Sequence, residues 1–361
     1  MAERQRKIIY INGKFLTQKL TGVQRCATEI VKALDKMAAD LPCELVLLTP
    51  KRTIRELPLR HMEVRHCGYL QGTLWEQLEL PFYARSGCLM NLCNCAPLVK
   101  RCQAVILHDV SFMAVPEAYG VCYTLWHRFM SWWLGRLLPL IFTDSAFSKT
   151  ELEKRLKIPS EKIRVVHLGA NHMEDIVLND TILAELGVER GSYVLAVSSQ
   201  SVHKNFRLVL EAAGQLPERK FVIVGQSNPA IFRSEAFVTV PGNVVFSGYV
   251  DDCRLAALYR YAACFVFPSI YEGFGLPPLE AMFYGTPVIA ANAASLPEVL
   301  GGGAFFIDPH SAEQLAEAID IVTGDTALRE KLAANALRQC RRYEWYSTAR
   351  QIMEGMVGFL C

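Results

Sequence analysis

Short apolar runs alternate with helical segments along the whole chain. In the first half, seven runs rich in Val, Ile and Leu are apolar on both faces, which is typical of buried strands in a parallel sheet. They cover residues 7–13, 44–49, 62–67, 89–91, 104–108, 140–144 and 163–168. The pattern then restarts with runs at 193–198, 221–225, 244–248, 264–268, 287–291 and 304–307. Strands and helices that alternate twice over predict two doubly wound α/β domains.

Helices are predicted between many of these strands. Residues 23–38 have an apolar face, and helices are expected to open at Ser148 and Ser311, where Glu151 and Gln314 complete the spacing of a capping box. Further helices are predicted at 205–215, 251–261, 279–284 and 296–300. The polar, mixed segment 171–190 separates the two halves. We therefore predict a first domain over 1–175 and a second over 176–340.

The region 119–142 is unusually aromatic. Apolar and basic side chains are interleaved in it. The apolar ones are Trp126, Phe129, Trp132, Trp133 and Leu137, and the basic ones are His127, Arg128 and Arg136. One interpretation is a core helix packed on the first sheet. The other is a face for an acceptor or a membrane surface, because interfacial helices carry Trp and basic residues of this kind.

Composition limits the class of protein. The chain has 361 residues, of which 51% are hydrophobic and 20% charged, enough apolar material for two cores and against disorder. The net charge of +2 gives no reason to expect a nucleic-acid partner. The first apolar run is too short for a signal peptide, and no uncharged run reaches the length of a membrane span. We therefore expect a cytoplasmic protein.

The 12 cysteines contain no CxxC pair. A zinc site normally needs two closely spaced ligand pairs, so we expect no metal there. Scattered thiols among apolar residues indicate small core residues in a reducing compartment.

The strongest chemical motif is YEGFGLPPLE at 271–280, between a predicted strand and a predicted helix. Glycines let a backbone approach a ligand closely, and Pro277 and Pro278 suit a helix start, whose amides and dipole favour a phosphate. Glu272 before the glycines and Glu280 in the first helical turn could accept hydrogen bonds from a sugar and a ribose. The alternative is two solvated surface charges beside an ordinary turn.

This segment, followed by GTPV at 285–288, resembles the E-x7-E signature of family-4 retaining glycosyltransferases of mannosyltransferase type. The resemblance covers nearly the whole chain and is most specific over 243–309. It implies the GT-B fold, in which two Rossmann-like domains face a cleft. It also implies that Glu272 contacts the donor sugar and Glu280 the ribose. The amides facing the sugar and diphosphate would be those of Gly273, Phe274, Gly275 and Leu276.

Lys204 in the His-Lys-Asn step resembles the lysine with which the family holds the diphosphate. Many members also carry an arginine just after the preceding strand, where this chain has Ser-Ser-Gln at 198–200; Arg207 is displaced from that place. Gly22 resembles the glycine of the first-domain loop, although a plain strand-to-helix turn would look the same.

His108 and Asp109 resemble a family motif at the inter-domain cleft, where the histidine lies near the transferred sugar. A satisfied core histidine is the alternative for His108, and Asp109 would either bind the acceptor or cap the next helix. Tyr249 matches a position that packs on the base. The expected catalytic set is Glu272, His108 and Lys204.

The resemblance further implies retention of anomeric configuration by front-face departure of the diphosphate, with no metal because no DxD motif is present. Residues 341–361 would form a last helix that packs back on the first domain. The best expectation for the donor is GDP-mannose, a substrate and not a cofactor, and for the acceptor a glycan or lipid-linked glycan of bacterial polysaccharide or lipopolysaccharide assembly. Peripheral contact with the cytoplasmic face of the inner membrane is a further expectation. A nucleotide-sugar epimerase, a catalytically silent nucleotide-sugar-binding protein and a membrane-surface scaffold are the competing functions.

Overall fold

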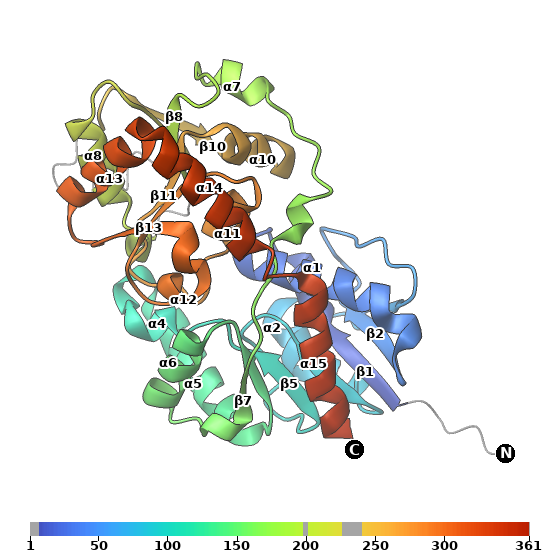
Figure 1. Ribbon diagram of the computed structural model, residues 1–361. Coiled ribbons are helices and arrows are strands. Elements are labelled where there is room, and N and C mark those ends of the chain that lie inside the picture. Colours follow the sequence, from blue (N-terminus) through green and yellow to red (C-terminus); the bar gives the residue numbers. More distant parts are fainter. Residues whose placement is uncertain (1–6, 198–200, 226–239, 361) are drawn as a thin grey trace. The chain divides into compact units, whose positions relative to one another are not determined.

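The computed structural model describes residues 7–197, 201–225 and 240–360, and divides the chain into two compact units. The first unit consists of Met1–Gly169 and Glu344–Cys361, and the second of Ala170–Tyr343. Both are built around a parallel sheet that helices accompany (Figure 1). The junctions lie at 169/170 and 343/344, whereas the sequence placed them at 175/176 and 340/341.

The first sheet has seven parallel strands in the order β3-β2-β1-β4-β5-β6-β7. Their bounds are β1 Lys7–Asn12, β2 Cys43–Thr49, β3 Glu63–His66, β4 Cys88–Asn91, β5 Gln103–Ile106, β6 Ile141–Thr143 and β7 Ile163–Val165. The helices of this unit are α1 Gly22–Met37, α2 Gly72–Leu74, α3 Leu80–Tyr83, α4 Ser111–Ala114, α5 Val121–Leu137, α6 Ala146–Leu156 and α15 Trp345–Leu360. Five short 3-10 or π turns complete it: η1 Gly13–Thr17, η2 Ala38–Asp40, η3 Trp75–Glu79, η4 Pro116–Ala118 and η5 Ser160–Lys162.

The second sheet has six parallel strands in the order β10-β9-β8-β11-β12-β13. They are β8 Tyr193–Val197, β9 Lys220–Val224, β10 Val244–Gly248, β11 Cys264–Phe267, β12 Val288–Ala291 and β13 Ala304–Ile307. The helices are α7 Thr181–Glu185, α8 Phe206–Gln215, α10 Asp252–Tyr261, α11 Leu276–Phe283, α12 Leu296–Leu300, α13 Ala312–Gly324 and α14 Thr326–Cys340. Short turns are η6 Asn171–Met173, η7 Val202–Lys204 and η8 Gly301–Gly303. The doubly wound α/β prediction is confirmed for both units.

Each sheet reverses its winding direction at one place. In the first sheet β1 lies between β2 and β4, and in the second β8 lies between β9 and β11. At such a switch point the loops that leave the two central strands diverge, and ligands bind at the carboxyl ends there. The loops after β1 and β4, and those after β8 and β11, are therefore the places to look for chemistry.

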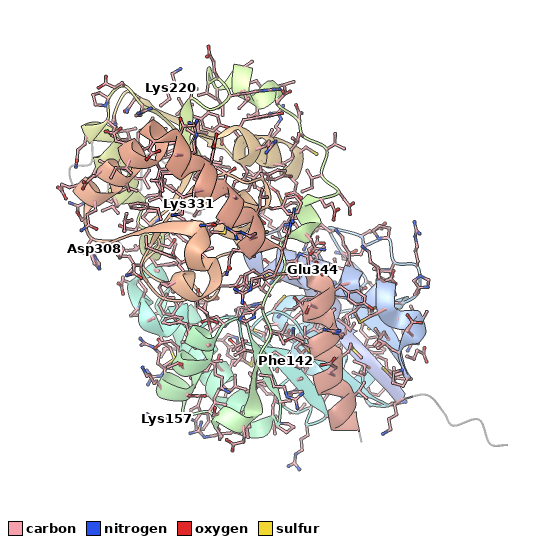
Figure 2. The ribbon with its side chains drawn as sticks, viewed as in Figure 1. Phe142, Lys157, Lys220, Asp308, Lys331 and Glu344 are labelled. Carbon is pink, nitrogen blue, oxygen red and sulfur yellow. A yellow bond between two sulfur atoms is a disulfide. The ribbon has the colours of Figure 1, made fainter. Side chains whose placement is uncertain are left out.

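The chain ends in the unit where it begins. Helix α15 packs against α1 and the first sheet, and a Cβ at Gly355 would lie 2.8 Å from the ring of Phe142 on β6 (Figure 2). The Thr348 hydroxyl donates to the His167 carbonyl oxygen. Residues 345–360 thus form a helix of the first unit.

Two local predictions need correction. Helix α6 is capped by Ser145, whose hydroxyl accepts from the Ser148 amide, so the predicted cap at Ser148 is wrong. Helix α14 was not predicted, although Asp325 caps it and Leu328, Leu332, Ala336 and Cys340 recur every four residues. Ser311 does cap α13, as predicted.

The expectation of reduced cysteines is wrong for one pair. Cys88 at the start of β4 and Cys102 before β5 form a disulfide across adjacent strands. The other described cysteines are free.

Among the described helices, none is long and apolar enough to cross a membrane.

Candidate functional site

The switch point of the second sheet brings two charged side chains together. Lys204 follows β8, Glu272 follows β11, and Lys204 Nζ donates to Glu272 Oε1 at 2.6 Å. Both side chains are mostly buried yet retain some contact with solvent. An ammonium and a carboxylate are thus held at the edge of the sheet where a ligand is expected.

Asn205 fixes the backbone on which Lys204 stands. Its φ of +57° lies in the left-handed region, which asparagine tolerates better than most residues. Its side-chain amide donates to the carbonyl oxygens of Pro268 at 3.1 Å and Pro309 at 2.6 Å. The carbonyl oxygen of His203 also accepts from the Ile270 amide. The loop after β8 is therefore tied to the loop after β11.

The glycine bend is required by its surroundings. Gly275 has φ +101°, and a Cβ there would lie 2.7 Å from Leu296 Cδ2. The buried Ser295 hydroxyl lies 2.9 Å from the Glu272 carbonyl oxygen and 3.1 Å from that of Phe274. Sequence reasoning missed this role of Ser295, which sits 23 residues beyond Glu272.

The side chains of the bend pack inward. The Phe274 ring is buried and makes an edge contact with Tyr343, and Leu276 is buried as well. Gly275 caps α11, whose first amides have no partner within the helix. The segment therefore offers backbone groups and a positive helix end, and not side chains, to an anion.

Glu280 lies one turn inside α11 and not in its first turn, where it was predicted. Its Oε1 is 3.1 Å from His172 Nε2, and its Oε2 accepts from the Tyr259 hydroxyl at 3.1 Å. Burial, followed by the charge of Glu280, raises the pKa of Tyr284 to about 12. A carboxylate has roughly four lone-pair sites, so Glu280 keeps acceptor capacity beside these two partners.

The other residues considered for binding of the nucleotide sugar lie on other segments of the second unit. Tyr249 follows β10 and is 75% exposed. Arg207 lies on the surface of α8, where it donates to Glu211. The segment 198–200, which replaces the family's arginine, lies outside the described residues.

In the first unit His108 is buried and bonded through both ring nitrogens. Nδ1 is 2.7 Å from Asp144 Oδ2, and Nε2 donates to the Leu92 carbonyl oxygen at 3.0 Å. Burial lowers the pKa of His108, but the charge and hydrogen bond of Asp144 outweigh it, and the net direction is upward. Because a carbonyl oxygen can only accept, Nε2 carries a proton; burial raises the pKa of Asp144, so His108 and Asp144 together hold the proton between Nδ1 and Oδ2.

Asp109 and Gly22 occupy turns that lead into helices. Asp109 Oδ1 accepts from the Ser111 amide at the start of α4. Gly22 is the first residue of α1 and is exposed, and a Cβ there would meet no described atom within 4 Å. The turn interpretation accounts for the contacts of both residues, and their roles toward a substrate remain predictions.

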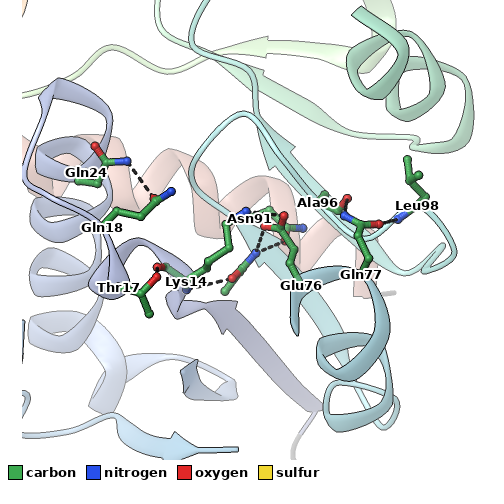
Figure 3. Close-up of polar contacts among 10 residues, drawn as sticks. Lys14, Thr17, Gln18, Gln24, Glu76, Gln77, Asn91, Ala96 and Leu98 are labelled. Carbon is green, nitrogen blue, oxygen red and sulfur yellow. Dashed lines mark hydrogen bonds and ion pairs between the residues drawn. The ribbon is translucent and has the colours of Figure 1, made fainter. Parts of the chain in front are cut away.

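A buried polar cluster lies at the switch point of the first sheet and was missed from the sequence. Lys14 Nζ pairs with Glu76 Oε2 at 2.5 Å (Figure 3). Asn12 donates to Glu76 Oε1 and to Asn91 Oδ1. Burial lowers the pKa of Lys14, but Glu76 more than offsets this and the net shift is upward. Asn12 and Asn91 end neighbouring strands, whereas Glu76 comes from η3, a segment without any sequence signal.

Within the described ranges, no three His, Cys, Asp or Glu side chains gather as they would around a metal ion.

Comparison with known proteins decides the family. The pattern described as Glycosyl transferases group 1 matches residues 180–339. An Escherichia coli O-antigen chain mannosyltransferase B is 30% identical over 260 residues, which cover 68% of this chain and 67% of that protein. The chain belongs to the glycosyl transferases group 1 family.

Other relatives of this glycosyltransferase agree. Serotype-specific mannosyltransferase WbdA of Escherichia coli is 29% identical over 61% of the chain, and the chain spans 29% of that longer relative. The Anabaena protein HepE, solved with UDP-glucose, superimposes with a TM-score of 0.75 at 19% identity over 98% of this chain and all of its own. The lipopolysaccharide glycosyltransferase WaaG gives 0.70 at 16% identity, over 97% of this chain and 100% of its own. The GT-B fold is thereby confirmed.

The range matched by the family includes some candidate residues of this group 1 glycosyltransferase and excludes others. Lys204, Tyr249, Glu272 and Glu280 lie inside the matched range, and His108 lies outside it.

Proposed function

We propose that this chain transfers a hexose, with mannose from GDP-mannose as the leading choice, to a glycan or lipid-linked acceptor in surface-polysaccharide assembly. The observation that carries the proposal is the Lys204–Glu272 pair beside the glycine bend and the first amides of α11. A nucleotide sugar has a dianionic diphosphate between two polyhydroxylated groups. At the bend, the Lys204 ammonium and the backbone amides are suited to the diphosphate. The carboxylates of Glu272 and Glu280 are suited to the hydroxyl groups on either side of it.

Donor binding would exchange partners at the pair. The Lys204 ammonium is paired with Glu272. When the nucleotide sugar binds, the ammonium would pair with the diphosphate instead. This would release Glu272 to accept from sugar hydroxyls, while Glu280 accepts from the ribose. Lys204 and the amides of Gly273–Leu276 would then stabilise charge on the leaving diphosphate, the main electrostatic task in such a reaction.

The choice of mannose rests on the relatives. Mannosyltransferase B, WbdA and the Salmonella typhimurium mannosyltransferase RfbU all carry that activity in their names, at 27–30% identity. HepE was solved with UDP-glucose, but its 19% identity supports only a shared fold. UDP-glucose is therefore the donor to test against GDP-mannose.

Retention and independence from metal follow from the resemblance of the E-x7-E segment. In this scheme no carboxylate acts as covalent nucleophile. The diphosphate leaves from the face that the acceptor attacks, and the protein positions the two reactants. Lys204 and the helix amides take the place of a metal ion at the diphosphate.

The test is a donor screen followed by a transfer assay. Thermal unfolding with GDP-mannose, UDP-glucose and UDP-galactose should show the largest rise in melting temperature with GDP-mannose, because a ligand that binds the native state stabilises it. Transfer to a mannose-containing oligosaccharide should persist in EDTA and give an α-linked product from the α-linked donor by NMR. No stabilisation by any of the three sugars, or donor turnover without an acceptor, would overturn the proposal.

A further inference from the structure

The two faces of helix α5 have opposite surroundings. On one side Met130 and Leu134 are fully buried in the core of the first unit. On the other side Val121, Leu125 and Phe129 follow each other at intervals of four residues and are exposed, Leu125 by 61%. Residues at this spacing share one helix face. A core helix accounts for the inner face of α5 and leaves the outer face unexplained.

The exposed face continues as a cluster of aromatic rings. Ring centroids lie 6.5 Å apart for Trp126 and Phe129, and 6.3 Å apart both for Phe129 and Trp133 and for Trp132 and Trp133. The indole of Trp133 donates to the Leu98 carbonyl oxygen, next to the exposed Val99. We call this set the α5 surface; its members are Val99, Val121, Leu125, Trp126, Phe129, Trp132 and Trp133.

The charged side chains of α5 itself have one sign. The sequence of α5 contains no Asp or Glu, and Arg128 and Arg136 are both exposed. The Arg136 guanidinium lies 3.9 Å from the centre of the Trp132 ring. Burial, with a smaller contribution from Lys14, lowers the pKa of His127 to about 4, so the histidine is neutral at pH 7. The positive charge of the helix therefore comes from the two arginines.

We propose that the α5 surface docks on an anionic lipid surface, with α5 lying in the plane of the headgroups. A contiguous exposed patch of large apolar side chains marks an interaction site in a folded protein. Exposed Trp and Phe beside Arg, on a helix that is not long and apolar enough to span a bilayer, form the pattern of an interfacial helix. Cations without any acid on α5 complement phosphate headgroups, and this complementarity favours a membrane over a second copy of the chain.

The first measurement is co-sedimentation of the full chain with phosphatidylcholine vesicles, with and without phosphatidylglycerol. We expect binding to the anionic vesicles, a blue shift of tryptophan fluorescence, and release at high salt. Leu125→Gln with Phe129→Gln should weaken partitioning by at least about tenfold, because two apolar side chains no longer leave water. Val177→Gln, at a residue 80% exposed in the second unit, is the matched control and should bind like the wild type.

The second measurement separates charge from apolar contact. Arg128→Gln with Arg136→Gln should weaken binding to anionic vesicles by about tenfold or more, since each arginine is attracted by the negative charge of such a surface. Binding to pure phosphatidylcholine should not change. Nucleotide-sugar stabilisation should be equal in all these variants, so loss of lipid binding is distinguishable from loss of the donor site.

Three results would overturn the proposal. The wild type could leave anionic vesicles unbound, or the Leu125/Phe129 variant could bind them like the wild type. Alternatively, the protein could form a dimer in solution that Phe129→Gln dissolves, which would assign the α5 surface to a second copy.

Discussion

Asp144 Oδ2 lies 2.7 Å from His108 Nδ1, at hydrogen-bonding distance, while the opposite nitrogen of the same ring donates to a backbone carbonyl. His108 follows β5 and Asp144 follows β6, so neighbouring strands of the first sheet hold the two residues at its carboxyl edge. The pair is a buried histidine and a buried acid that hold one proton between Nδ1 and Oδ2. A histidine whose ring is already fully bonded would reach a substrate only by giving up the Leu92 carbonyl.

Asp144→Asn tests the charge state of this pair. The folded protein raises the pKa of His108 above its usual value near 6.5, so its contribution to stability is complete below that pH and is lost as the pH rises through the folded pKa. The stability advantage of the wild type over Asp144→Asn should therefore shrink between pH 6 and pH 9, by at most about 1.4 kcal/mol per pH unit. Urea unfolding across this range measures it. Glu161→Gln, at an exposed acid of the same unit, is the control, and an advantage that grows with pH would contradict the assignment.

Glu272→Gln tests the partner exchange at the bend. The variant keeps the shape of the side chain but loses its charge, so we expect turnover to fall by roughly a hundredfold while the fold is preserved. Lys204→Met should instead weaken affinity for the nucleoside diphosphate itself. Steady-state kinetics and calorimetry distinguish the two. Glu317→Ala, at an exposed acid on α13, should leave both unchanged, and wild-type turnover in Glu272→Gln would remove this residue from the site.

Glu280→Ala should act on binding rather than on turnover. A hydrogen bond to a charged group contributes about 1.5–3 kcal/mol, so affinity for the nucleotide should fall by roughly tenfold or more. Tyr259→Phe removes only the hydroxyl that Glu280 accepts from, and its effect should be smaller. Titration calorimetry with GDP gives both values. Equal affinity of Glu280→Ala and wild type would show that the ribose is held elsewhere.

Glu76→Ala should be strongly destabilising. It leaves the Lys14 ammonium buried without its partner, which costs about 3–5 kcal/mol. Lys14→Met combined with Glu76→Leu should recover most of that loss, because no charge then remains buried. Calorimetric unfolding measures both variants. The surface pair of Arg65 and Glu63 is the control, and Glu63→Gln should cost less than about 1 kcal/mol.

Gly275→Ala should lower both stability and donor binding. It combines a left-handed φ with a clash against Leu296 at the bend. Gly191→Ala is matched to it, because Gly191 has φ +73° but no described atom within 4 Å of its Cβ position. That control should cost about 1–2 kcal/mol through backbone strain and leave donor binding unchanged. Wild-type affinity of Gly275→Ala for the nucleotide sugar would show that the bend tolerates a Cβ atom at this position.

The sequence was sufficient wherever the decisive contacts are local. Apolar runs located the strands because a parallel strand is buried on both faces, and the spacing of Ser311 and Gln314 identified the start of α13. It failed at α6, where Ser145 and Ser148 were both acceptable caps and the strand ending at Thr143 places the first of them at the helix start.

Contacts between distant segments could not be derived in the same way. Glu272 was chosen from its motif, but its pairing with Lys204, 68 positions away in the sequence, depends on β8 and β11 being neighbours. His172, which reaches Glu280 across 108 residues, stands in a segment that looked like a plain polar linker. Glu76 gave no signal because a single acid in a weakly patterned stretch resembles a surface charge.

The second unit is an insertion within the first. The Ala170 amide donates to the Tyr343 carbonyl oxygen, so its two ends are adjacent, and Gly169 meets the backbone of Trp345 too closely for any Cβ. Truncation of the reading frame before codon 344 should therefore disrupt the first unit, which loses α15, and leave the second unit intact. Conversely, residues 170–343 expressed alone should fold, because the two ends of that segment are adjacent, and joining residue 169 to residue 344 should close the gap that it leaves.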